Sequence, residues 1–193
     1  MPCSPSPGGS AGTSGFSKSC TTASLTCTPA CRGGDSVTAI YTIGHSNHEA
    51  DRFIALLKQH GVQAVVDVRS SPYSRYVPQA NREALARALP AAGIAYYWWG
   101  DRLGGKPGGK PGAVADYDVL RLAPSFQEGI AALEPLAAAQ STAIMCSEGD
   151  HTRCHRHKLI TPELLARDLH VLHIQPDGSV VDESASPRQL SLF

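Results

Sequence analysis

The chain has 193 residues, 42% hydrophobic content, and 17 basic and 17 acidic side chains. The length suits one domain, and the hydrophobic content suits a chain that buries a core. The balanced charge neither indicates nor excludes a polyanionic partner, because basic residues can cluster locally. The longest apolar runs are much shorter than a membrane span, so no membrane association is expected.

Residues 1–36 are rich in Ser, Gly, Thr and Pro and contain few large apolar side chains. Such a segment cannot bury enough surface to offset the entropy lost on ordering, so a disordered tail is predicted. It lacks the apolar region of a secretory signal, and a cytoplasmic, reducing location is therefore expected. Free thiols are expected at the four cysteines of this tail, Cys3, Cys20, Cys27 and Cys31.

Strands and helices are predicted to alternate along residues 37–181. The expected strands are apolar or β-branched runs at residues 37–43, 62–68, 94–99, 142–146 and 171–174. The expected helices lie between them, at residues 47–60, 81–89 and 125–139 and from about residue 154 onward. This alternation predicts a single three-layer α/β domain with a mostly parallel sheet of about five strands.

Capping residues place the starts of these helices. Ser46 or Asn47 could cap the first helix, and Ser125 with Glu128 forms a capping-box pattern for the third. The last helix should begin near Cys154 and restart around Pro162, since proline is favoured at the first helical position.

Four polar segments each follow a predicted strand. They are residues 44–46, 67–75, 101–105 and 146–156. The carboxyl ends of parallel strands share one edge of a sheet, so the four segments are expected to converge on one crevice.

Asp67 and Arg69 lie on either side of Val68 and so should point the same way from the strand end. With Arg75, they could present two guanidinium groups to an anionic substrate. Alternatively, Asp67 and Arg69 form a structural ion pair that braces the loop. Ser74 adds a hydroxyl group to the same loop.

Gly104 and Gly105 could allow backbone to approach a phosphate group closely. The alternative is a flexible lid without a binding role. Lys106 and Lys110 make this segment locally basic.

Cys146 is the candidate nucleophile. Arg153, Arg156 and the amino end of the following helix could stabilise its thiolate. The spacing departs from the Cys-x5-Arg pattern of phosphatases, because the first arginine follows six intervening residues. The alternative is a buried cysteine that packs at the strand end.

The segment that follows Cys146 also contains donors suited to zinc: Cys154, His155, His157 and His151. Their spacing matches no standard zinc signature, so no metal site is predicted and no cofactor is indicated. Glu148 could orient His155 or act as a general base, or could pair with Arg156 without a catalytic role.

The chain ends in the apolar peptide of residues 189–193, after a polar stretch at residues 182–188 that should form a flexible tether. Exposed apolar anchors at a free terminus suit a motif that binds a groove, although Leu192 and Phe193 could also fold back onto their own domain. The peptide resembles the pentapeptide by which bacterial polymerases and repair proteins bind the DNA sliding clamp. The resemblance depends on Gln189, Leu190, Leu192 and Phe193.

Across residues 38–175, the motifs of the expected crevice occur in an order that resembles the domain of unknown function 488 family. They are residues 42–46, residues 67–69 with Pro72, Ser74 and Arg75, residues 103–105, Met145 and Cys146 with Glu148, residues 154–156, and Ile160. The resemblance implies a compact α/β domain and a set of candidate site residues. It implies no particular reaction.

The first hypothesis is a bacterial cytoplasmic protein of DNA repair or replication maintenance, tethered to the sliding clamp and acting on a nucleotide or a nucleic-acid end. Its candidates for acid, base or nucleophile are His45, Cys146, Glu148 and His155. Its expected anion-binding residues are Ser46, Asp67, Arg69, Ser74, Arg75, Gly104, Gly105, Cys154 and Arg156. The alternatives are a small-molecule enzyme that uses the Cys146 thiolate for sulfur or phosphoryl transfer, and a binding module without catalysis.

Overall fold

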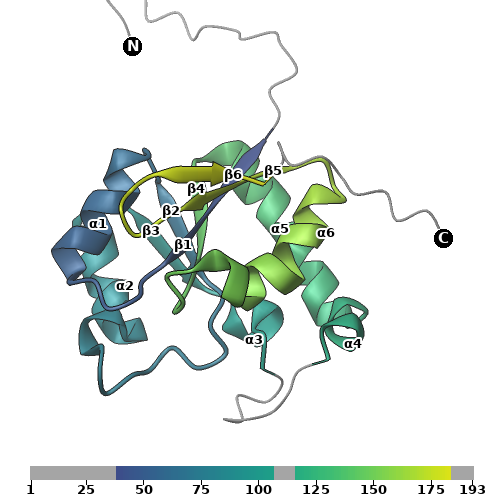
Figure 1. The fold of residues 1–193 in the computed structure, drawn as a ribbon, viewed down its shortest axis with the longest axis horizontal. Coiled ribbons are helices and arrows are strands. Elements are labelled where there is room, and N and C mark those ends of the chain that lie inside the picture. The colour runs from purple at the N-terminus through teal and green to yellow at the C-terminus, as the bar shows by residue number, and fades with distance from the viewer. Residues whose placement is uncertain (1–37, 107–115, 184–193) are drawn as a thin grey trace, which may run out of the picture. The chain divides into compact units, whose positions relative to one another are not determined.

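The computed structural model describes residues 38–106 and 116–183 (Figure 1). The predicted tail at residues 1–36, Lys110 and the terminal peptide at residues 189–193 lie outside the described residues. Within the described residues, no helix combines the length and the apolar character needed to cross a membrane.

A six-stranded sheet, in the order β3-β2-β4-β1-β5-β6, forms the centre of the domain. Its strands are β1 (Ala39–Gly44), β2 (Ala64–Asp67), β3 (Ala95–Trp98), β4 (Thr142–Cys146), β5 (His170–Ile174) and β6 (Val180–Asp182). Strands β1 to β5 pair in parallel, and β6 is antiparallel to β5. The prediction of an α/β domain with a mostly parallel sheet is confirmed, with one strand more than expected.

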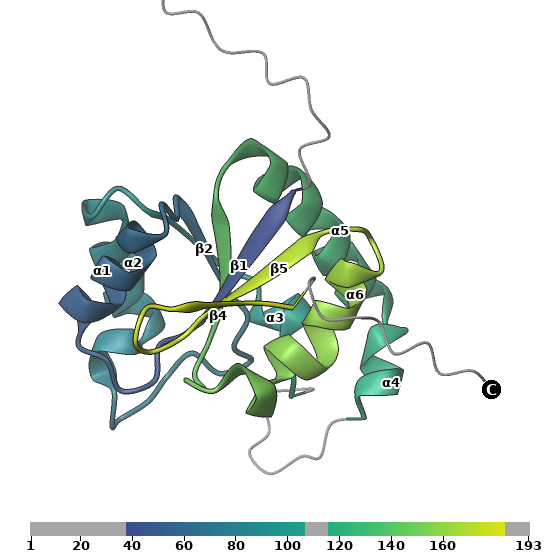
Figure 2. The ribbon, with the colours of Figure 1, turned by 45° about the horizontal axis from the view of Figure 1, so that its top comes forward.

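Helices cover both faces of the sheet (Figures 1 and 2). The α-helices are α1 (Ala50–Gln59), α2 (Arg82–Ala91), α3 (Gly100–Leu103), α4 (Tyr117–Arg121), α5 (Pro124–Ala139) and α6 (Thr161–Leu165). Two short 3-10 helices, η1 (Pro78–Ala80) and η3 (His151–Arg153), and one π-helix, η4 (Arg156–Ile160), complete the described elements.

Two apolar clusters hold these layers together. The cluster on one face joins the sheet to α1 and α2, with Leu57 and Leu89 as fully buried members. The cluster on the other face joins it to α5 and α6 and includes Ile130 and Leu164. Every residue of β2 and β4 is buried, as expected for central parallel strands covered on both faces.

The helix starts differ from the predicted caps. Glu49 occupies the N-cap of α1, whereas Ser46 adopts a left-handed backbone conformation with φ of 47°. Helix α5 starts at Pro124, so the predicted capping box of Ser125 and Glu128 does not form. Proline fixes φ near the helical value and is favoured at a first helical position, which accounts for the earlier start.

Candidate functional site

The ends of β1, β2 and β4 meet at one edge of the sheet, where Gly44 lies opposite Cys146 and Asp67 lies opposite Met145. The pairing continues beyond the strands, because the amide of His45 donates to the carbonyl of Cys146 at 2.9 Å. A Cβ atom on Gly44 would lie only 1.8 Å from the carbonyl oxygen of Glu148. Glycine therefore permits the close backbone approach that brings the two loops together.

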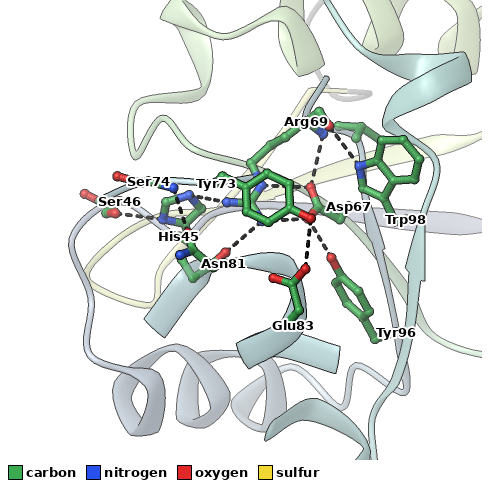
Figure 3. Close-up of polar contacts among 12 residues, drawn as sticks. His45, Ser46, Asp67, Arg69, Tyr73, Ser74, Asn81, Glu83, Tyr96 and Trp98 are labelled. Atoms are coloured by element: carbon green, nitrogen blue, oxygen red, sulfur yellow. Dashed lines mark hydrogen bonds and ion pairs between the residues drawn. The ribbon is translucent and has the colours of Figure 1, made fainter. Parts of the chain in front are cut away.

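Asp67 and Arg69 form a buried ion pair at the end of β2 (Figure 3). Oδ1 of Asp67 accepts from Nε of Arg69 at 2.8 Å, and Oδ2 accepts from Nη2 at 2.6 Å. Tyr96 also donates to Oδ2 at 2.8 Å, and Nη2 of Arg69 donates to the carbonyl of Ala80 at 2.8 Å. Asp67 is completely buried, and its two carboxylate oxygens fix the orientation of the Arg69 guanidinium group.

His45 completes this network. Its Nε2 lies 2.9 Å from Nη1 of Arg69, and its Nδ1 lies 2.8 Å from the carbonyl of Ser46. The Nδ1–H tautomer satisfies both contacts, with Nε2 accepting from the guanidinium. Burial, then the charge of Arg69, lowers the pKa of His45 to about 4. Both ring nitrogens are engaged, so the geometry favours a positioning role over the acid–base role expected for His45.

These contacts occupy four of the five N–H groups of Arg69 and leave one Nη1 donor for a ligand. The bracing ion pair and the anion-binding role, considered as alternatives from the sequence, are therefore compatible in one side chain.

Cys146 lies at the end of β4 and is 6% exposed. Its pKa is lowered, chiefly because the thiol of Cys154 donates a hydrogen bond to it, with further help from the amides of Ser147 and Glu148 and from the charge of Arg156. Burial opposes this shift. Cys154, as the donor, has its pKa raised. The thiolate is thus favoured on Cys146, in the environment that a nucleophilic cysteine requires.

His155 faces both sulfur atoms. Its Nε2 lies 3.2 Å from the carbonyl of Val68, whereas Nδ1 lies 3.4 Å from Sγ of Cys146 and 3.7 Å from Sγ of Cys154. Donation from Nε2–H to the carbonyl leaves the lone pair of Nδ1 directed at the thiols. His155 can therefore accept the proton of Cys146, as in a Cys–His pair.

The same three residues could hold a metal ion, because their ligand atoms lie within 4.8 Å of one another. Two cysteines and one histidine whose other nitrogen donates to a carbonyl form a known type of zinc ligand set. His151 and His157, which the sequence grouped with these residues, belong to a separate cluster with His173 and Glu183.

A crevice in two adjoining parts lies above these groups. The first part, of about 220 Å³, has Cys146, Cys154 and His155 in its lining. The second, of about 400 Å³, is lined by residues that include His45, Ser46 and Ser74. Both parts share Arg69, Ser71, Ser147 and Glu148.

Four of the expected anion-binding residues line neither part of this crevice: Asp67, Arg75, Gly104 and Arg156. Asp67 is completely buried against Arg69. Arg156 is completely buried and donates from Nη2 to the carbonyl of Gly149 at 3.1 Å. Arg75 turns outward and lies against the ring of Tyr76. Gly104 packs against Ser70, and its neighbour Gly105 lines the first part, where a Cβ atom would lie 2.7 Å from His155.

Other side chains, not in the expected site, do line the crevice. Lys106, Arg153 and Tyr117 line the first part, and Tyr73 and Tyr76 line the second. The sequence placed Arg153 near Cys146 and predicted that the loops of residues 101–105 and 146–156 converge, but it indicated Lys106 only as a basic residue of its loop. Tyr117 follows a segment outside the described residues, and its sequence context contains no signal for a site.

A protein-family model described as "Domain of unknown function DUF488" matches residues 49–161, which is more than half of the chain. The matched segment contains Asp67, Arg69, Cys146, Cys154 and His155, and it ends before β5. Comparison with curated proteins and comparison with solved structures each found no match.

Proposed function

Because this chain belongs to the DUF488 family, whose description names no activity, we propose from its own crevice that the domain binds a nucleotide or a nucleic-acid end through phosphate. One observation carries the proposal. The part of the crevice above Cys146 is lined by three cationic side chains, Arg69, Lys106 and Arg153, and one carboxylate, Glu148. Guanidinium and ammonium groups around a small cavity are suited to phosphate oxygens.

The adjoining part of the crevice supports a nucleic-acid ligand. Tyr73 and Tyr76 line it and are 56% and 78% exposed. Exposed aromatic rings beside a basic groove provide stacking surfaces for bases, while the cations contact the backbone. Arg69 borders both parts, so one ligand could place its phosphate above Cys146 and a base against a tyrosine.

The proposal can be tested by measuring, with fluorescence anisotropy, how tightly the protein binds 5′-phosphorylated and 5′-hydroxyl oligothymidylate. The expected result is at least tenfold tighter binding of the phosphorylated probe, and loss of that difference in the variant Lys106→Gln/Arg153→Gln. Equal affinity of both probes for the wild-type protein would exclude recognition of a terminal phosphate. Arg75→Gln is the matched control, because Arg75 is a nearby cation outside the crevice lining.

A second candidate function is small-molecule catalysis by the Cys146 thiolate, as in sulfur or phosphoryl transfer. The lowered pKa of Cys146 and the adjacent Nδ1 of His155 favour it. Sγ would bond to phosphorus or sulfur of the substrate while the leaving group departs, and protonated His155 would supply the proton. In a binding module without catalysis, Cys146→Ser and His155→Ala would both retain ligand affinity.

We further propose that Gln189, Leu190, Leu192 and Phe193 attach the protein to the DNA sliding clamp in the cytoplasm of a bacterium. The similarity of this terminal peptide to clamp-binding pentapeptides supports the proposal, and the free thiols of Cys146 and Cys154 are compatible with a reducing compartment. Clamp pull-down should retain the full chain and lose a chain without residues 189–193. Equal retention of both would exclude this attachment.

A further inference from the structure

A second group of potential metal ligands lies around β5 and the neighbouring edge strand β6, and it shares no residue with the group at Cys146. It consists of His151 of η3, His157 of η4, His173 of β5 and Glu183, which follows β6. One ligand atom from each residue lies within 4.8 Å of the other three. We propose that these four residues bind a divalent transition-metal ion, with Zn²⁺ as the ion best matched to the donor set.

The separations within the cluster favour an ion over hydrogen bonds. Oε2 of Glu183 lies 3.5 Å from Nε2 of His173 and 3.8 Å from Nδ1 of His157. N–H···O hydrogen bonds are shorter, at about 2.7–3.2 Å. Two ligands of one tetrahedral zinc ion, with bonds of about 2.0–2.1 Å, lie about 3.3 Å apart. The observed separations therefore need only a small inward movement, which the partly exposed His157 and Glu183 can make.

Two buried nitrogens in the cluster have unused bonding capacity. Across the described part of the chain, Nε2 of His173 and Nδ1 of His157 find no hydrogen-bond partner. His173 is completely buried, so solvent cannot supply one. Buried polar atoms without partners are costly and uncommon in native proteins, and coordination of an ion would satisfy both nitrogens.

Residues around the cluster orient its rings. Oγ1 of Thr42 lies 2.6 Å from Nδ1 of His173 and can accept its N–H, which leaves the lone pair of Nε2 for an ion. The rings of His151 and His173 stack with their centroids 4.2 Å apart. The amide nitrogen of Gln175 lies 3.1 Å from Nδ1 of His151 and donates to the carbonyl of His173 at 3.1 Å, which fixes the His151 ring beside β5.

Some charged groups near the cluster oppose a bound cation, and others favour it. Burial lowers the pKa of His173 to about 3, which keeps this imidazole neutral, as a metal ligand must be. Arg156 is close enough to lower the pKa of both His151 and His173, so its charge opposes a bound cation. Glu183 and Asp150 act on His151 in the opposite sense, and Glu183 would bind the ion directly.

Three imidazoles and one carboxylate would complete a closed tetrahedral site of the structural kind. The ion would connect η3, η4 and β5 to the residue after β6. His151 and His157 flank residues 154–156 in the chain, so the ion would also fix the loop that positions Cys154 and His155. This inference does not depend on the function proposed for the crevice.

The site can be tested by titrating Co²⁺ into metal-free, full-length protein in which all six cysteines are replaced by serine. The expected result is one equivalent of Co²⁺ with the visible absorption of a tetrahedral ion and no thiolate charge-transfer band. His157→Ala and Glu183→Gln should each weaken binding at least tenfold. His170→Ala, an exposed histidine on the same strand, should not. Binding that is absent in the serine variant, or equal in all histidine variants, would overturn the proposal.

Zn²⁺ titrated alone into the wild-type protein gives a second readout that does not require the serine variant to fold. Saturating Zn²⁺ should raise the midpoint of thermal unfolding for the wild type and for His170→Ala. The increase should be clearly smaller in His157→Ala, in which only the ligand set of Cys146, Cys154 and His155 stays intact. An equal increase in all three proteins would place the bound ion elsewhere and contradict the proposal.

Discussion

Nδ1 of His155 lies 3.4 Å from Sγ of Cys146, while the opposite nitrogen of the same ring lies 3.2 Å from the carbonyl of Val68. The second contact holds the ring so that the first can form. Cys146 thus has a proton acceptor, a thiol donor from Cys154 and backbone amides around a single sulfur atom. This convergence at the end of β4 is the basis of the reactivity expected for Cys146.

Cys146 should be alkylated by iodoacetamide at pH 6.5 faster than a free thiol, because its lowered pKa gives a larger thiolate fraction. Replacement of Cys154 with alanine removes the principal hydrogen-bond donor and should slow the reaction several-fold at this pH. Mass spectrometry of the Cys146 peptide measures the rate. A Cys146 that reacts no faster than glutathione would contradict the thiolate assignment.

Removal of the carboxylate of Asp67 should strongly destabilise the domain. Asp67→Asn leaves the buried guanidinium of Arg69 without its counter-charge, and breaking one side of a buried ion pair costs about 3–5 kcal/mol. Urea denaturation measures the free energy of unfolding. Asp118→Asn is the control, because it breaks an exposed pair with Arg121 and should have little effect. A loss of unfolding free energy in Asp67→Asn as small as that in Asp118→Asn would show that the buried network contributes little to stability.

A methyl group at Gly44 should also destabilise the fold, by about 1–3 kcal/mol or more, because its Cβ would overlap the carbonyl of Glu148. Gly149→Ala is the matched control in the facing loop, where the nearest atom would be Oγ of Ser46 at 3.3 Å. Thermal unfolding of both variants checks this prediction. A Gly44→Ala protein as stable as Gly149→Ala would mean that the two loops can separate without cost.

His45 should make the domain less stable as the pH falls. Its pKa is 6.5 ordinarily and about 4 in the fold, where burial and the charges of Arg69 and Arg156 outweigh Asp67 and the carbonyl of Ser46. Between these values the unfolded chain binds a proton that the folded chain does not. The contribution of His45 to the free energy of unfolding is therefore fully present above pH 6.5. It is lost as the pH falls toward 4, with a slope of up to about 1.4 kcal/mol per pH unit.

The variant His45→Gln tests this assignment through urea denaturation at pH values from 7 to 4. The contribution of His45 to the slope should disappear, whereas His170→Gln, at an exposed position, should keep the wild-type slope. A wild-type slope in His45→Gln would assign the acid sensitivity to other groups.

Much of the fold follows from local sequence patterns. The strand at residues 142–146 has the predicted bounds, because a short apolar run between a helix and a polar loop suits a strand buried on both faces. Strand β6 was not predicted, since all three of its residues are exposed and it is held by a turn in which Gly178 has φ of 94°. Short exposed strands have little hydrophobic pattern to detect.

The site was less predictable than the fold, because side-chain direction in loops depends on contacts distant in the chain. Arg75 and Lys106 are both loop cations, yet only Lys106 lines the crevice. His151 and His157 lie close to Cys154 in the chain, but they join His173 and Glu183 instead. Proximity in sequence therefore suggested one mixed set of possible zinc ligands, whereas residues 38–106 and 116–183 bring these side chains together in two separate clusters.

A phosphate-bearing ligand bound in the crevice above Cys146 should shield this residue from alkylation. The alkylation rate of each cysteine in the presence of 5′-phosphorylated oligothymidylate measures this protection. The expected result is at least tenfold slower labelling of Cys146, with no change at the four cysteines of residues 1–36 and no protection in Lys106→Gln/Arg153→Gln. Undiminished labelling of Cys146 at saturating probe, or equal protection by the 5′-hydroxyl probe, would contradict this mode of binding.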